Sequence, residues 1–111
     1  MPRIIHTGQA LVDATARIPA LPDRGQNVMA SAWDQAAGGA VNILVAAARQ
    51  GATCVYAGAI GTGPNGDLVR AALGAEGVTW SGAPVPDADT ALCFVLVEPT
   101  GERTFVTMLG A

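Results

Sequence analysis

The stretch Gly38-Gly39-Ala40-Val41-Asn42-Ile43-Leu44-Val45-Ala46 decides how this chain folds. It predicts a helix over residues 40–50, because apolar residues recur at the spacing of one helix face and Gly51 follows as a stop signal. The two glycines before this helix have no side chains, so a small ligand can approach the main chain there. One turn later, Asn42 offers a carbonyl acceptor and two amide donors. The stretch therefore predicts a site for a polyhydroxylated ligand at the start of the helix.

Strand and helix patterns alternate on both sides of this stretch. A second amphipathic run predicts a helix, and apolar or alternating runs predict strands over residues 4–8, 11–16, 27–34, 53–60, 78–81, 91–97 and 103–109. The second helix is expected over residues 67–75, which gives the strand–helix rhythm of an α/β protein. The strand over 27–34 and the hairpin over 91–109 do not fit a doubly wound sheet. We expect them to form a small separate sheet that projects from the main one.

The composition limits the class of protein. The 111 residues are the usual size of one domain, half of them are hydrophobic and 14% are charged. A net charge of −3 with only six basic residues gives no electrostatic footprint for nucleic acid. No run of about 18 apolar residues is present to support a membrane span. We therefore expect neither nucleic acid nor a membrane as a partner.

The two cysteines indicate packing rather than chemistry. Cys54 and Cys93 lie far apart in apolar runs and match no metal-binding or redox spacing. Cysteine in such runs usually acts as a small hydrophobic residue. Polar residues, among them His6 and Asp13, interrupt any signal-peptide core near the N-terminus. These observations favour the cytoplasm as the location.

The chain resembles the ribokinase-like (PfkB) carbohydrate kinases. The resemblance is carried by the stretch quoted above and by Gly8, Asp13, Gly51, Gly58-Ala59-Ile60-Gly61, Gly66-Asp67-Leu68 and Thr100-Gly101-Glu102-Arg103. It covers residues 1–111 but only the N-terminal third or so of a typical member. It implies an α/β fold with a mainly parallel sheet, flanking helices and a small β lid, whose strands are expected at about residues 16–37 and 90–109. Because Ala111 follows directly on the last predicted strand, we expect the C-terminal nucleotide-binding part to be absent.

The same resemblance implies a function. The complete enzyme would be an ATP-dependent phosphotransferase that phosphorylates a hydroxyl of a sugar, polyol or nucleoside, with ATP and Mg²⁺ as cofactors. Asp13, Gly38, Gly39 and Asn42 match the family's substrate-binding positions. The family's late catalytic aspartate and GAGD-type helix start do not occur here, so we expect this segment alone to bind no cofactor and to be inactive. We also expect a homodimer built through the lid strands.

The identity of the sugar stays open at this point. Leu11 stands where ribokinase itself has a polar sugar contact, and the glycine motif lacks ribokinase's lysine and one further residue. Other sugars, sugar acids and nucleosides therefore remain candidates beside ribose. The position that is phosphorylated is open as well.

Two other kinds of function remain open on the sequence. Residues 61–66 read GTGPNG, a literal GxGxxG between a strand and a helix, which is typical of dinucleotide-binding modules. The acid about twenty residues on, Asp87, lies in a proline-flanked loop rather than at the end of a second strand. The other alternative is a non-catalytic oligomerisation domain whose lid strands pair between chains.

Overall fold

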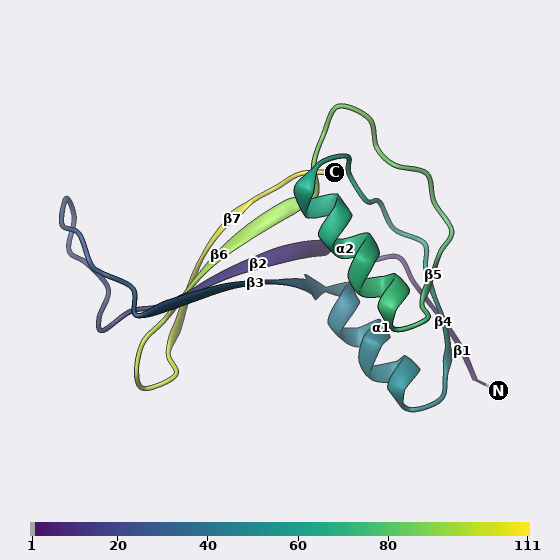
Figure 1. Cartoon of the computed structure of the whole chain (residues 1–111), viewed down its shortest axis with the longest axis horizontal. Coiled ribbons are helices and arrows are strands. Elements are labelled where there is room, and N and C mark those ends of the chain that lie inside the picture. The colour runs from purple at the N-terminus through teal and green to yellow at the C-terminus, as the bar shows by residue number, and fades with distance from the viewer. Residues whose placement is uncertain (1) are drawn as a thin grey trace.

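The computed structural model describes residues 2–111 and places them in two sheets and two helices (Figure 1). The first sheet is parallel and has the order β1 (Arg3–His6), β4 (Thr53–Tyr56), β5 (Thr79–Trp80). The second has the order β3 (Ala32–Gly39), β2 (Ala10–Arg17), β6 (Ala91–Val97), β7 (Arg103–Met108). The helices are α1 (Ala40–Arg49) and α2 (Pro64–Ala75). The expected α/β class is confirmed.

The main core lies between the two helices and one face of the parallel sheet. The helical periodicity of α1 buries Val41 and Leu44, and that of α2 buries Val69 and Leu73. These side chains pack with Ala10 and Val12 of β2, with Cys54 and Tyr56 of β4, and with Ile60 in the loop that follows β4. On the opposite face of β1, Ile5 is 59% exposed, so the helices cover one face of this sheet only. Neither helix described between residues 2 and 111 is long and apolar enough to cross a membrane.

The second sheet projects away from this core as a curved ribbon (Figure 1). Its central strand β2 pairs antiparallel with β3 and parallel with β6, and β6 forms a hairpin with β7. Because side chains alternate along a strand, the sheet has two distinct faces. We name them the Asp13 face, which also carries Thr15, Arg17, Cys93, Val95, Val97, Arg103 and Phe105, and the Trp33 face, which carries Ala14, Phe94 and Val106.

The prediction of a separate sheet is right, but the two strands that precede its hairpin, β2 and β3, differ from those expected. The strand expected over 27–34 has the wrong bounds: only residues 32–34 of it lie in a strand, because β3 begins at Ala32 and residues 18–31 form an irregular arm. The sequence of β3, AWDQAAGG, has little strand propensity, and pairing with β2 along its whole length makes it a strand. The strand over 11–16 belongs entirely to this projecting sheet, as β2.

Two further boundaries differ from expectation. The strand expected over 53–60 ends at Tyr56, and α2 begins at Pro64 rather than at residue 67. A Cβ at Gly58 would lie 2.3 Å from the Tyr56 hydroxyl, so the chain turns closely around that ring. The hydroxyl accepts from the Ala10 backbone N–H at 3.1 Å and donates to the Gly8 carbonyl at 2.8 Å. Tyr56 therefore links β4 of the parallel sheet to the start of β2 in the projecting sheet.

Candidate functional site

Asp13 and Gly38 come together on neighbouring strands. Asp13 lies on β2, between Ala36 of β3 and Cys93 of β6. Its carboxylate rests against the backbone of Gly38, where a Cβ would lie 2.3 Å from the Asp13 Oδ2 atom. Burial raises the pKa of the Asp13 carboxyl above its usual value of 3.8, and the nearby Arg103 guanidinium opposes this only in part. Asp13 thus presents a half-buried carboxylate next to the Gly38 backbone, which carries no side chain.

Gly39 makes the turn from β3 into α1. Its φ is +63° and its ψ is −127°, a conformation that residues with a side chain rarely adopt. A Cβ at Gly39 would lie 2.5 Å from the Gln9 carbonyl oxygen, which accepts from the Ala40 N–H at 2.9 Å. The turn thus fixes the start of α1 against the connection between β1 and β2.

Asn42 lies in the first turn of α1 and is exposed, on the side away from the buried Val41 and Leu44. Within residues 2–111 no hydrogen bond links its amide to Asp13. The structure therefore brings Asp13 and Gly38 into contact, and places Gly39 and Asn42 at the adjoining helix start.

A hollow of about 280 Å³ opens beside Asp13 on the Asp13 face. Its polar groups are a carboxylate, a hydroxyl and two guanidinium groups, and its apolar surface includes one aromatic ring. It is lined by Asp13, Thr15, Arg17, Val95, Val97, Gly101, Arg103 and Phe105. No pattern in the sequence predicts this hollow. The alternation of β2 would place residues 13, 15 and 17 on one face, but the register that adds β7 depends on the folded sheet.

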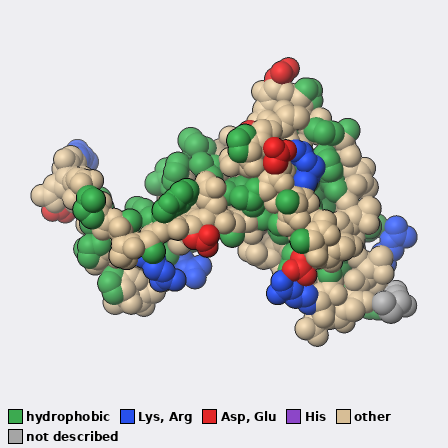
Figure 2. All heavy atoms as spheres, in the orientation of Figure 1, with side chains coloured by type: hydrophobic (Ala, Val, Ile, Leu, Met, Phe, Trp, Pro, Cys, Tyr) green, Lys and Arg blue, Asp and Glu red, His purple; other side chains and the backbone are tan. Residues whose placement is uncertain are grey.

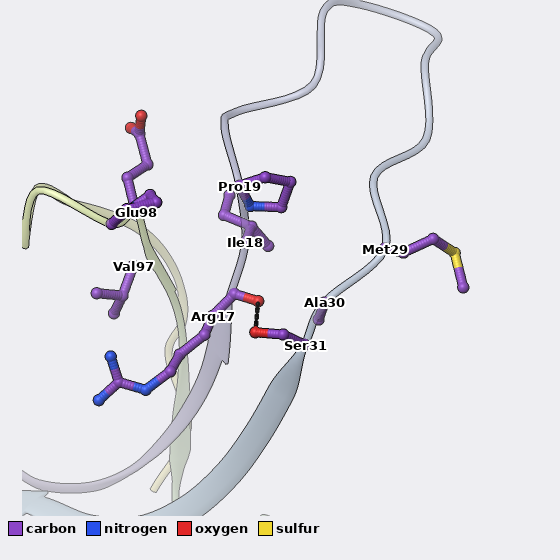
Figure 3. A pocket seen from close by; sticks show the side chains of 9 residues that line it. Arg17, Ile18, Pro19, Met29, Ala30, Ser31, Val97 and Glu98 are labelled. Atoms are coloured by element: carbon purple, nitrogen blue, oxygen red, sulfur yellow. Dashed lines mark hydrogen bonds between the residues drawn. The ribbon is translucent and has the colours of Figure 1, made fainter.

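A larger hollow of about 490 Å³ lies between the arm and the β6–β7 hairpin (Figure 3). Its lining is largely apolar, with Ile18, Pro19, Met29, Val97 and Pro99 among the residues. Figure 3 shows the Arg17 side chain turned away from the arm and the Glu98 carboxylate pointing outward. This hollow therefore lacks the converging polar groups that a sugar requires.

The glycine-rich loop before α2 is filled by a side chain of the protein itself. The Asp89 carboxylate accepts hydrogen bonds from the backbone N–H groups of Asn65 at 3.0 Å, Gly66 at 2.8 Å and Thr90 at 2.7 Å. A Cβ at Gly63 would lie 2.7 Å from the Asp89 Cγ atom. Asp89 thus occupies the position at the helix start where a pyrophosphate would bind. The dinucleotide-binding interpretation of residues 61–66 is not supported.

Asp89→Ala is expected to lower the free energy of unfolding by about 1–3 kcal/mol at pH 7, because α2 loses its acceptor. Burial raises the pKa of the Asp89 carboxyl, but the N–H groups of Gly66, Asn65 and Thr90 and the Arg70 guanidinium outweigh it and leave the pKa below 3.8. A lowered pKa stabilises the fold above the unfolded-state pKa, and this contribution disappears as pH falls through the folded-state value. Urea unfolding at several pH values should show the difference between wild type and variant shrinking below about pH 4. A difference that does not change with pH would contradict the role of the Asp89 carboxylate as the N-terminal cap of α2.

Comparison with known proteins identifies the family of the chain. Residues 1–111 match the pfkB family carbohydrate kinase profile. The chain belongs to the pfkB family of carbohydrate kinases. Among pfkB relatives, the uncharacterized sugar kinase YegV of Escherichia coli (strain K12) is 34% identical over 108 residues, which are 96% of this chain and 33% of YegV.

Solved pfkB-type structures share the fold. The ribokinase of Cryptococcus neoformans var. grubii serotype A, in complex with ADP, has a TM-score of 0.88 and 26% identity, over 100% of this chain and 36% of that one. The fructokinase of Xylella fastidiosa has a TM-score of 0.71 and 34% identity, over 95% of this chain and 31% of that one. The chain thus spans about a third of the length of these relatives.

Proposed function

We propose that the complete protein is an ATP-dependent sugar kinase, and that this segment supplies part of its sugar site and a lid over it. The observation that carries the proposal is the Asp13 carboxylate, held against Gly38 and open to a hollow of about 280 Å³. An ionised carboxylate can accept hydrogen bonds from two neighbouring sugar hydroxyls. Membership of the pfkB family supports a carbohydrate as the ligand of this carboxylate.

Each predicted site residue has a distinct role in this proposal. Asp13 accepts from hydroxyl groups. Gly38 and Gly39 contribute to the sugar site by leaving room for the Asp13 carboxylate and for the close turn into α1. Asn42, exposed in the first turn of α1, donates to or accepts from a further hydroxyl. The four-stranded sheet, which projects beyond the core and carries Asp13, serves as the lid (Figure 1).

The phosphoryl donor is assigned to the remainder of the protein. Phosphoryl transfer needs a group that accepts the hydroxyl proton, and donors or a metal that stabilise the developing charge. The part of the chain described in the structure gathers no three His, Cys, Asp or Glu side chains that could hold a metal. The fungal ribokinase was solved with ADP, which supports ATP as the donor here. We place Mg²⁺, the base and the nucleotide site in the remaining part of the kinase, and its activity in the cytoplasm.

The test is sugar-dependent formation of ADP by the complete protein, measured with a panel of pentoses, hexoses, sugar acids and nucleosides. We expect ATP consumption to require one class of these acceptors and the product to gain one phosphate. Residues 1–111 alone should give no turnover. If no member of the panel stimulates ATP consumption by the folded protein, the proposed function is wrong.

We further propose that a second copy of the chain covers the Trp33 face. This face exposes large apolar side chains, since Trp33 is 67%, Phe94 42%, Val106 56% and Met108 52% exposed. An isolated sheet of few strands is marginally stable in water, so burying such a face against a second lid would stabilise both. The kinase would then be a homodimer that is joined through its lid strands.

Phe94→Glu in the complete protein is expected to raise the dimer dissociation constant at least about tenfold, because a carboxylate would be buried without a partner. Sedimentation at several protein concentrations measures this, with circular dichroism as the check on folding. Ala71→Glu, on the exposed side of α2, is the matched control and should leave association unchanged. A wild-type protein that stays monomeric at high micromolar concentration would refute the dimer.

A further inference from the structure

Two arginines lie in one row across the Asp13 face. Arg17 of β2 pairs with Val97 of β6, and Val97 pairs in turn with Arg103 of β7. Paired residues of neighbouring strands point to the same side of a sheet, so both guanidinium groups flank Val97 on the Asp13 face. Both also line the hollow that contains Asp13. Figure 2 shows neighbouring basic side chains over the strands of this sheet, beside an acidic one.

Neither arginine has a partner of opposite charge in contact. The two ion pairs found among residues 2–111 join Arg49 to Glu76 and Arg70 to Asp67. Asp34 lies beside Arg17 in an adjacent hollow, yet the two form no ion pair within 4.0 Å. The hollow itself holds one carboxylate, Asp13, and two guanidinium groups. Two guanidinium groups against one carboxylate leave the hollow with a net positive charge, which a bound anion would balance.

We infer that the sugar which this kinase phosphorylates carries an anionic group, a carboxylate or a phosphate, and that Arg103 and Arg17 bind it. The inference rests on the proposed function and names its substrate class. The guanidinium fork matches the oxygens of a carboxylate or phosphate and can bind them through paired hydrogen bonds.

The rest of the hollow suits the remainder of such a molecule. Asp13 and Arg17 are four residues apart on β2, about 13 Å along the strand, and the long arginine side chain spans part of that distance. Asp13 and Thr15 offer oxygens to hydroxyl groups, while Val95 and Phe105 offer apolar surface to the carbon skeleton. The hydroxyl end and the anionic end of one molecule would thus meet groups of matching chemistry.

The experiment measures kcat/KM of the complete kinase for paired probes that differ in charge. D-Gluconate is compared with D-glucose, D-galactonate with D-galactose, and D-fructose 6-phosphate with D-fructose. We expect one anionic member to exceed its neutral partner at least about tenfold, and to lose this advantage at high ionic strength. Preference for the acids identifies a carboxylate, and preference for the ester identifies a phosphate.

Variants then assign the preference to the arginines. Arg103→Gln and Arg17→Gln should each reduce kcat/KM for the anionic probe roughly 10- to 100-fold, with little change for a neutral sugar. Arg24→Gln, on the arm, is the matched control and should change neither. A kinase that prefers neutral sugars, or one whose anionic preference survives both substitutions, overturns the inference and leaves the proposed function standing. A protein that phosphorylates no probe of either kind overturns both.

Discussion

Gly39→Ala is expected to lower the free energy of unfolding of the complete protein by about 3 kcal/mol and to abolish measurable sugar binding. The added Cβ would meet the Gln9 carbonyl oxygen at 2.5 Å, and a φ of +63° is strained for alanine. Relieving the steric clash and the backbone strain requires β3 to move away from the connection between β1 and β2. The Asp13–Gly38 contact would then be displaced as well. Urea unfolding and sugar titration measure the two effects.

Gly51→Ala is the matched control for this prediction. Gly51 also has a positive φ, +96°, but a Cβ there would meet nothing within 4 Å. The Gly51→Ala variant should therefore lose stability through backbone strain alone and keep its affinity for sugar. If Gly39→Ala is no more harmful than Gly51→Ala, the close approach at the start of α1 is not what shapes the site.

Asp13→Asn should raise the KM for the sugar by roughly 30- to 150-fold, because about 2–3 kcal/mol of charge-assisted hydrogen bonding is lost. The substitution keeps the shape that fits against Gly38 and removes the charge. Asp34→Asn, on the same face of the sheet opposite Thr15, is the matched control and should change KM little. Steady-state kinetics at saturating ATP measure both variants, and an unchanged KM for Asp13→Asn would exclude Asp13 as the sugar-binding carboxylate.

The pH dependence of the wild type gives a second check on Asp13. Burial raises the pKa of this carboxyl above 3.8, and the ionised form is the one that accepts from two hydroxyls. The affinity for sugar should therefore begin to fall at a higher pH than an ordinary aspartate would give, as the carboxyl takes up a proton. Asp13→Asn should show no such fall.

Local patterns account for the parts of the fold that the sequence predicted. The apolar spacing from Val41 to Ala48 and the stop at Gly51 place α1 within one residue of its observed end at Arg49. The turn between β6 and β7 is equally local, since Glu98 and Glu102 close it through a backbone hydrogen bond of 2.9 Å. Helix periodicity and turn chemistry act over a few residues, so both features can be read directly.

The parts that were missed depend on residues far apart in the chain. Asp89 caps a helix that begins 25 residues earlier, and no short-range pattern links it to Pro64. The hollow beside Asp13 needs the register that sets Arg103 opposite Val97. Asp13 and Gly38 are 25 residues apart, and only their family resemblance brought them together before the fold was known. Register and capping at such distances follow from the whole sheet, not from local propensity.

Calorimetric titration of the complete protein is the most direct test of the central claim, that this segment binds the sugar through Asp13. The sugar that is turned over, and separately a non-hydrolysable ATP analogue, are titrated into wild type and into Asp13→Asn. We predict that the variant loses most of its affinity for the sugar and keeps its affinity for the nucleotide. Equal sugar affinity in the two proteins, with both folded, would contradict the account.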